Sequence, residues 1–362
     1  MVRRTARNRL AHDLTNRGLS AWILAAGIFV FYLVLYYTDA FTPVANAIGL
    51  DSKWTFYGLL YTIAIVTGGV FVIRRYRRNR YQMVRTSVVM ATQITLAFSI
   101  PQILKVLHQP EYYFSYLWPL KLDYGTPGYL FHLPLGFVLY SVVGSLIMVP
   151  LLAVFFGKRW YCSWICGCGG LANTAGEPFR HLTSKSSAAW RFEKVSIHTV
   201  LALCLLLTGL LFVSYGIGDH HPALAKFTYT YQSWYGFVVV VMLSGIIGVG
   251  AYPIGGTRVW CRNFCPMAAL LGLTQKLGRY RITVKDNMCI SCGLCSKYCE
   301  MGIDVRSYAQ ANTSFTRASC VGCGLCAEVC PRGVLRLENV PRTSPQERLI
   351  QIAPAIRRPV LN

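Results

Sequence analysis

Eight cysteines near the C-terminus are spaced as ligands of metal clusters. Residues 289–299 read CISCGLCSKYC and residues 320–331 read CVGCGLCAEVCP, so the pattern C-x2-C-x2-C-x3-C occurs twice. This doubled spacing is typical of bacterial ferredoxins with two 4Fe-4S clusters, in which the fourth cysteine of each motif ligates the other cluster. We therefore expect one cluster at Cys289, Cys292, Cys295 and Cys330, and the second at Cys320, Cys323, Cys326 and Cys299.

Zinc and disulfide bonds are the alternative explanations for these cysteines. Structural zinc sites usually take two C-x2-C pairs, and a third cysteine in each short segment does not fit that pattern. Disulfides are disfavoured if this part of the chain is cytoplasmic. Gly293, Gly322 and Gly324 would let the backbone approach the sulfides of a cluster. Glu300 stands where proline often follows the fourth cysteine, a change that affects the turn and leaves the ligands in place.

Two further cysteine pairs occur earlier in the chain, in similar surroundings. RWYCSWIC at 159–166 holds Cys162 and Cys166, and RVWCRNFCP at 258–266 holds Cys261 and Cys265. The tripeptide GFV precedes both, at 136–138 and at 236–238. We interpret this similarity as an internal repeat in parallel orientation, which would bring both pairs to the same membrane face near a common axis. If each pair lies on a helix, its two sulfurs share one face.

These four cysteines are candidate ligands of a further metal centre. Four thiolates in one set favour an iron-sulfur cluster or another thiophilic metal. A redox-active disulfide, docking loops with incidental cysteines, and buried inert thiols remain open alternatives. Cys168 has no counterpart in the second segment, so it is either a substitute ligand or a bystander, whereas Cys204 is expected to be a packing residue.

The composition indicates that a membrane positions these cysteines. Of 362 residues, 54% are hydrophobic and only 14% are charged, which is unusual for a soluble domain. A spanning helix needs roughly 20 apolar residues. Runs of about that length predict six transmembrane helices, at 21–38, 55–73, 86–104, 134–156, 195–216 and 235–254.

The basic residues alternate between the two sides of these helices. The net charge is +22, and its basic residues, Arg85, Lys158 and Arg180 among them, concentrate on every second connection. This is the positive-inside pattern, and it predicts a multi-pass protein of a prokaryotic inner membrane with both termini and the ferredoxin domain cytoplasmic. No nucleic-acid motif accompanies the charge, so we do not expect a nucleic-acid partner. The first apolar run is too long for a signal peptide and is expected to be an uncleaved anchor.

We therefore expect an α-helical integral membrane protein with six spans and an internal two-span parallel repeat, followed by an α+β two-cluster ferredoxin domain. The expected division is a basic N-terminus at 1–19, the first two spans at 20–84, membrane repeat one at 85–170, a loop at 171–194, membrane repeat two at 195–270, the ferredoxin domain at 276–340 and a tail at 341–362.

This combination of motifs resembles the NapH/NosR-type membrane polyferredoxins, over roughly residues 85–340. The longest outer loop, 105–133, leaves no room for the flavin domain of NosR-like members, so the shorter NapH-like members are more similar. Gly167 replaces the proline that follows the first C-x3-C in that family. The resemblance implies electron transfer between the quinone pool and a partner redox protein or subunit, as part of a quinone-linked oxidoreductase. The alternative is a metal-handling protein, for example one that reduces copper, or a redox sensor.

A quinone site needs proton acceptors beside aromatic rings, and the outer loops supply both. The candidates are Glu111, Trp118, Asp123, Asp219, His220 and His221. Aromatic residues also gather at membrane interfaces without any ligand. Four histidines near the outer ends of the spans could ligate a b-type haem, but no second pair exists at the inner side, so we do not expect haem.

Overall fold

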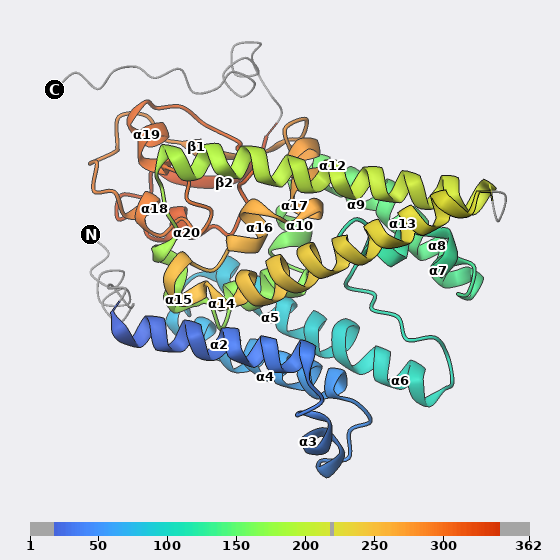
Figure 1. Ribbon diagram of the computed structural model, residues 1–362. Helices are drawn as coiled ribbons and strands as arrows, with labels where there is room; N and C mark the ends of the chain where they lie inside the picture. The colour runs from blue at the N-terminus through green and yellow to red at the C-terminus, as the bar shows by residue number, and fades with distance from the viewer. Residues whose placement is uncertain (1–17, 218–220, 341–362) are drawn as a thin grey trace.

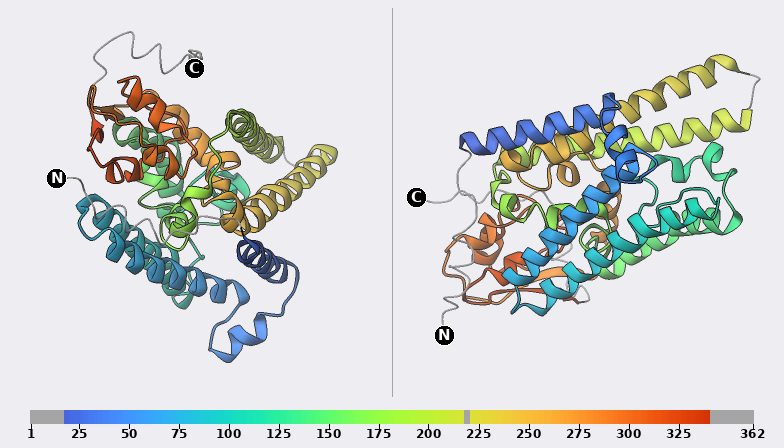
Figure 2. Two further views of the ribbon diagram at one scale, coloured as in Figure 1. Left: turned by 90° about the vertical axis from the view of Figure 1, so that its left-hand side faces the viewer. Right: turned by 90° about the horizontal axis from the view of Figure 1, so that it is seen from below.

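The structure is a computed structural model that describes residues 18–217 and 221–340. Within these residues, six helices are long and apolar enough to cross a membrane. Figures 1 and 2 show them side by side, with the C-terminal segment at one end of the bundle. The spans are Leu19–Tyr37, Lys53–Arg75, Arg80–Val106, Leu135–Phe156, Ser187–Ile217 and Pro222–Gly250.

The first, second and fifth spans are uniform α-helices, whereas the other three contain a π-helical stretch. The uniform spans are α2 (Leu19–Tyr37), α4 (Lys53–Arg75) and α12 (Ser187–Ile217). The others are α5 (Arg80–Thr92), Gln93–Ser99 and α6 (Ile100–Val106); α8 (Leu135–Val143), Gly144–Met148 and α9 (Val149–Phe156); and α13 (Pro222–Tyr235), Gly236–Ile247 and α14 (Gly248–Gly250). Because π-helical turns often occur at functional sites, these three spans are of particular interest.

The sixth span differs most from the sequence prediction. It begins at Pro222, well before the expected start at 235. The predicted span starts only at 235 because the polar residues Thr228, Thr230 and Gln232 lower the hydropathy of the segment before it. Proline at the first helical position starts a helix readily, and none of the residues that follow it breaks one. The helix therefore extends into the segment that was expected to be an outer loop.

The surface of the spans is apolar, as a lipid environment requires. Leu139, Leu146, Leu205 and Phe212 are among the large apolar side chains that are exposed on these helices. An exposed apolar surface of this extent marks a membrane or an interaction surface. The six helices are therefore consistent with a multi-pass membrane protein.

The connection between the third and fourth spans turns inward, although we expected it to stay at the outer face. It contains a short helix, α7 (Pro127–Leu130), and a 3-10 turn, Leu122–Gly125, and Figure 1 shows it running back from α6 toward the middle of the molecule. The Tyr140 hydroxyl donates to the carbonyl of Phe114 (2.7 Å), and the Tyr161 hydroxyl donates to that of Ser115 (2.9 Å). We call residues 109–121 the inward loop.

The C-terminal segment packs against the ends of the spans and forms one core with them. Its strands β1 (Tyr280–Val284) and β2 (Leu335–Asn339) pair antiparallel, from Tyr280 opposite Asn339 to Val284 opposite Leu335. A single buried cluster joins Ile282 and Leu335 of this sheet to Val149, Ala153 and Leu201 of the spans. The remaining short helices are α3 (Thr42–Ala47), α18 (Leu294–Lys297), α19 (Val305–Gln310) and α20 (Leu325–Glu328).

A glycine in α4 permits a close backbone approach and offers a test of this packing. A Cβ atom at Gly68 would lie 2.4 Å from the backbone nitrogen of Ala175, whereas one at Gly27 in α2 would meet nothing within 4 Å. We expect Gly68→Ala to lower the thermal unfolding temperature in detergent, since overpacking costs about 1–3 kcal/mol. Gly27→Ala should leave it unchanged or raise it, because alanine is the better helix former. Equal unfolding temperatures for the two variants would contradict this packing.

Candidate functional site

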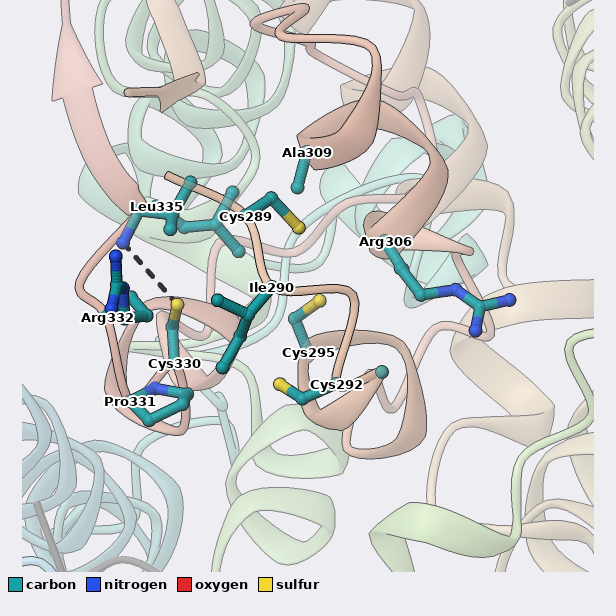
Figure 3. Close-up of a pocket in the computed structure, with 12 residues that line it drawn as sticks. Cys289, Ile290, Cys292, Cys295, Arg306, Ala309, Cys330, Pro331, Arg332 and Leu335 are labelled. Atoms are coloured by element: carbon teal, nitrogen blue, oxygen red, sulfur yellow. Dashed lines mark hydrogen bonds between the residues drawn. The ribbon is translucent and has the colours of Figure 1, made fainter. Parts of the chain in front are cut away.

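The first expected set of cluster ligands surrounds one small cavity. Cys289, Cys292, Cys295 and Cys330 all line it, and Figure 3 shows their sulfur atoms around the same space. The backbone N–H of Val334 donates to the sulfur of Cys330 at 3.4 Å. Cys292 is exposed, and Ile290 beside it is 56% exposed. This cavity therefore lies at the surface of the protein.

The second expected set lines another cavity, deeper in the protein. Its cysteines are Cys299, Cys320, Cys323 and Cys326. The loops around both cavities depend on glycine, because Gly293 (φ +74°), Gly322 (φ +61°) and Gly324 (φ +78°) have left-handed backbone angles. Among the described residues, no three His, Cys, Asp or Glu side chains form a site for a single metal ion. A 4Fe-4S cluster is a different ligand, since its four thiolates bind four separate irons.

The two C-x3-C segments have the same local structure. Each begins after a glycine with positive φ, Gly157 (φ +71°) or Gly256 (φ +89°). In the first segment the N–H of Cys166 donates to the carbonyl of Tyr161 (2.9 Å), and in the second that of Cys265 donates to Trp260 (3.1 Å). The helices that carry them are α10 (Arg159–Cys162), α11 (Gly167–Asn173), α15 (Tyr252–Gly255), α16 (Val259–Asn263) and α17 (Pro266–Gln275).

The two cysteines of each pair do not lie on one helix, so the condition for a shared helix face is not met. Cys162 ends α10, and Cys166 is the residue that caps the start of α11. Cys261 likewise lies in α16, and Cys265 caps α17 with its sulfur accepting from the N–H of Ala268 (3.4 Å). The helix breaks between the two cysteines of each pair, after Cys162 in the first segment and after Asn263 in the second. Sequence spacing did not reveal this break.

The structure brings all four of these cysteines together in the interior. They are at most 6% exposed. Cys162 interacts electrostatically with Cys166 and Cys261, and Cys265 interacts with the other three. We call Cys162, Cys166, Cys261 and Cys265 the thiol set. It lies where the fourth and sixth spans end and the ferredoxin segment begins.

Burial of the thiol set disfavours free thiolates. Burial raises the pKa of Cys162 to about 12, although Lys158 and Arg258 oppose the shift. Burial also raises the pKa of Cys261 and of Cys265. These thiols therefore stay protonated unless a metal replaces their protons. The two buried cations would then offset part of the charge of four thiolates.

Cys168 and Cys204 lie in different environments. Cys168 is partly buried and hydrogen-bonds with Cys166. This hydrogen bond raises the pKa of Cys166. Cys204 is fully buried in α12, with its sulfur 4.0 Å from the carbonyl of Pro119. Gly169 allows the first segment to fold tightly, since a Cβ atom there would lie 1.9 Å from the carbonyl oxygen of Cys162.

Hydrogen bonds from residues near the thiol set reach the segment that carries the deeper ferredoxin cysteines. The Gln275 side chain accepts from the N–H of Lys158 (2.9 Å) and donates to the carbonyl of Cys320 (3.1 Å). The hydroxyl of Ser163, next to Cys162, donates to the carbonyl of Val321 (2.7 Å). The thiol set and the second ferredoxin set are therefore neighbours within one packed core.

Glu300 joins both C-x3-C segments to the ferredoxin segment. It is fully buried, and its two carboxylate oxygens each lie 3.1 Å from a buried arginine, Arg180 or Arg258. Arg258 also donates to the carbonyl of Cys162 (3.3 Å) and to the sulfur of Cys261 (3.7 Å). Burial favours the neutral acid, but the arginines outweigh it and lower the pKa of Glu300 to about 2. Arg180 belongs to a 3-10 turn, Glu177–Leu182, and pairs with Glu177 as well.

Several of the basic residues that the sequence assigned only to membrane topology are buried structural groups. Arg85 and Arg180 are each 1% exposed, and Lys158 is fully buried. Arg85 donates to the carbonyl of Cys323 (3.0 Å), as does Gln82 (2.7 Å). These side chains hold the ferredoxin segment against the spans, a role that residue type and position alone do not reveal.

A cavity of about 720 Å³ lies beside the thiol set and was not expected from the sequence. It is lined by α2, α4, the π-helical parts of the third and sixth spans, and the inward loop. Cys168 and Cys261 form part of its wall. Its tyrosines include Tyr32, Tyr36, Tyr57 and Tyr61. Tyr32 and Tyr36 in α2 are four residues apart, as are Tyr57 and Tyr61 in α4, so each pair lies on one helix face. This spacing is the sequence signal that could have indicated the cavity.

The residues proposed for an outer quinone site do not gather in one place. Asp123 lines the cavity, but Glu111 is exposed and hydrogen-bonds with Tyr113. Trp118 turns inward and donates from Nε1 to Thr208 in α12 (3.1 Å). His221 is exposed at the start of α13. Asp219 and His220 lie outside the described residues.

Comparisons with known proteins identify the iron-sulfur segments. Residues 282–337 match the family described as 4Fe-4S dicluster domain. Residues 138–186 and 235–285, which contain the two C-x3-C pairs, both match the family described as 4Fe-4S binding domain. The chain therefore contains 4Fe-4S cluster-binding domains. No solved structure matches it.

Its relatives are distant and partly named for electron transport. The putative electron transport protein YccM of Escherichia coli is 28% identical over 43% of this chain and 45% of its own length. The methylamine utilization ferredoxin-type protein MauN of Methylobacillus flagellatus is 26% identical over 44% of this chain and 54% of its own. An uncharacterised protein of Methanocaldococcus jannaschii is 24% identical over 47% of this chain and 65% of its own length. The chain thus spans about half to two thirds of the relatives it matches, and these names support a role in electron transfer.

Proposed function

We propose that this protein transfers electrons between quinone in a lipid bilayer and a partner redox protein, through a metal centre at the thiol set and two 4Fe-4S clusters. The observation that carries the proposal is the position of the thiol set. It is buried between the ends of apolar helices and the ferredoxin cysteines. The same 4Fe-4S family matches both C-x3-C segments, which supports an iron-sulfur cluster there.

The order of the sites defines a path from membrane to surface. The thiol set neighbours the second ferredoxin set through Gln275, and the exposed Cys292 belongs to the first. Iron-sulfur clusters exchange single electrons. A quinol that is oxidised releases two electrons into this path and two protons to water, and an oxidised partner protein takes up both electrons. The potential of the partner sets the direction.

The protein's own residues hold this path in place. Lys158 and Arg258 offset the negative charge of the thiol set, and Glu300 fixes Arg258 against it. The surface around Cys292 and Ile290 is where the partner protein docks. In this proposal the ferredoxin segment and both termini are cytoplasmic, at the inner membrane of a prokaryote, because the basic connections lie on that side.

The test is oxidation of the chemically reduced protein by a short-chain quinone without oxygen. We expect the clusters to be reoxidised, with one quinol formed for every two electrons lost. Absence of any reaction with quinone, together with rapid reoxidation by Cu²⁺, would contradict the proposal and favour a metal-reducing function instead.

A further inference from the structure

We propose that the cavity beside the thiol set is the quinone-binding site, with the quinone ring beside Gln93 and Tyr116 and a proton route through Asp123. This inference rests on the proposed function and gives it a specific site. The cavity of about 720 Å³ is within the usual range for small-molecule sites. It replaces the outer-loop site that the sequence suggested.

The cavity wall next to the thiol set carries polar groups that could hydrogen-bond with a quinone. A Cβ atom at Gly167 would lie 2.8 Å from the Tyr116 hydroxyl, 3.0 Å from Gln93 Oε1 and 3.4 Å from the Tyr61 hydroxyl. These three groups therefore converge at a residue that has no side chain, between Cys166 and Cys168. All three side chains line the cavity.

Gln93 provides an independent sign that a ligand is expected here. Its side chain is fully buried, and its Nε2 donates to the carbonyl of Ile165 (3.0 Å). Its Oε1 has no hydrogen-bond partner within the described residues. A buried acceptor without a donor is costly, and native proteins rarely leave one. A quinol hydroxyl in the cavity would donate to it.

The rest of the cavity suits the remainder of a quinone molecule. Beyond Gln93, its walls are the rings of Tyr57 and Trp54 and the apolar side chains Val239 and Val240. Aromatic and aliphatic walls with a few convergent polar groups are typical of such sites. Because Cys261 forms part of the same wall, a ring in the cavity lies next to the thiol set.

A second cavity adjoins this site and shares two of its lining residues. It has a volume of about 610 Å³ and is lined by Pro127, Tyr215 and Ala225 among others. Asp123 and Gln232 line both cavities. In this proposal the two electrons of a quinol leave one at a time through the thiol set, and its two protons pass in turn through water in the cavity to the Asp123 carboxylate and from there to water in the second cavity.

A cavity-filling variant tests the site. Gly236 lies on the same helix face as Gln232, Val239 and Val240, and a Cβ atom there meets nothing within 4 Å. We expect Gly236→Leu to weaken binding of a short-chain quinone by at least about tenfold, because overpacking a binding cavity costs about that much. Quenching of tryptophan fluorescence measures binding, since Trp54 and Trp260 line the cavity.

The matched control is Gly209→Leu, at an exposed position in α12 that is equally open but does not line the cavity. It should bind quinone like the parent. Both variants should keep the iron content of the parent and be reduced by dithionite. Unchanged quinone binding in Gly236→Leu would overturn the site.

A photoreactive azidoquinone, applied to the parent protein, tests the same site without any variant. We expect labelled peptides from α4 and the π-helical stretch Gly236–Ile247. Labelling confined to Asp219, His220 and His221, which the sequence suggested as quinone ligands, would overturn the site and leave the proposed function intact. If the parent neither binds quinone nor is reoxidised by it, the proposed function fails as well.

Asp123→Asn separates proton transfer from binding. We expect quinone binding within about twofold of the parent, but quinol oxidation slower by about 100-fold, which is the usual effect of removing a proton acceptor. The control is Glu111→Gln, an exposed carboxylate that lines neither cavity. Equal oxidation rates for Asp123→Asn and the parent would contradict the proton route.

Discussion

The double variant Cys261→Ser, Cys265→Ser is expected to lose iron that the ferredoxin segment does not hold. Two 4Fe-4S clusters account for about 8 irons per chain, and a centre at the thiol set adds to that number. Anaerobically purified parent protein should therefore contain more than about 8 irons, and the double variant about 8. Iron and acid-labile sulfide per chain are the measurements.

Cys204→Ser is the control for this experiment. Cys204 is also a buried cysteine, but it packs against the inward loop and is not part of the thiol set. This variant should keep the iron content of the parent. About 8 irons in both the parent and the double variant would mean that the thiol set holds no iron. The relay would then have to begin at the second ferredoxin set.

The second large effect is expected at Glu300. Glu300→Gln leaves Arg180 and Arg258 buried with much less opposing charge, since only Glu177 remains beside Arg180. Removing one partner of a buried ion pair typically costs roughly 3–5 kcal/mol. We expect a clearly lower thermal unfolding temperature and easier proteolysis between the spans and the ferredoxin segment.

The control for Glu300→Gln is Asp286→Asn, which removes an exposed carboxylate from the same segment. It should leave the unfolding temperature unchanged. A similar small effect for both variants would show that the Glu300 ion pairs do not hold the two parts together.

The pH dependence of the Glu300 contribution follows from its pKa. The arginines lower this pKa from 4.5 to about 2 against the opposing effect of burial. A folded-state pKa below the unfolded value means that the stabilisation is complete above about pH 4.5 and is lost as the pH falls toward 2. At neutral pH the pairs are therefore intact.

The sequence alone was sufficient to predict the features that depend on local information. Six apolar runs predicted six helices of spanning length, because a membrane imposes a minimum length on each. The doubled cysteine spacing predicted a 4Fe-4S dicluster domain, since a cluster takes its ligands from short loops. Similar residues around Cys162 and Cys261 predicted an internal repeat, which stays a prediction, although both segments begin after a glycine with positive φ.

Only the tertiary structure decided which residues meet across the chain. Arg258 and Glu300 are 42 residues apart, and nothing in the spacing of either indicates an ion pair. The inward loop consists of residue types that are also common at a membrane interface. Composition therefore could not distinguish a loop that folds into the protein from one that stays at the interface. The cavity depends on several segments that are far apart in the sequence, and its shape follows from their packing. A buried arginine and a solvated one look the same in a sequence, because burial is a property of the contacts that folding creates.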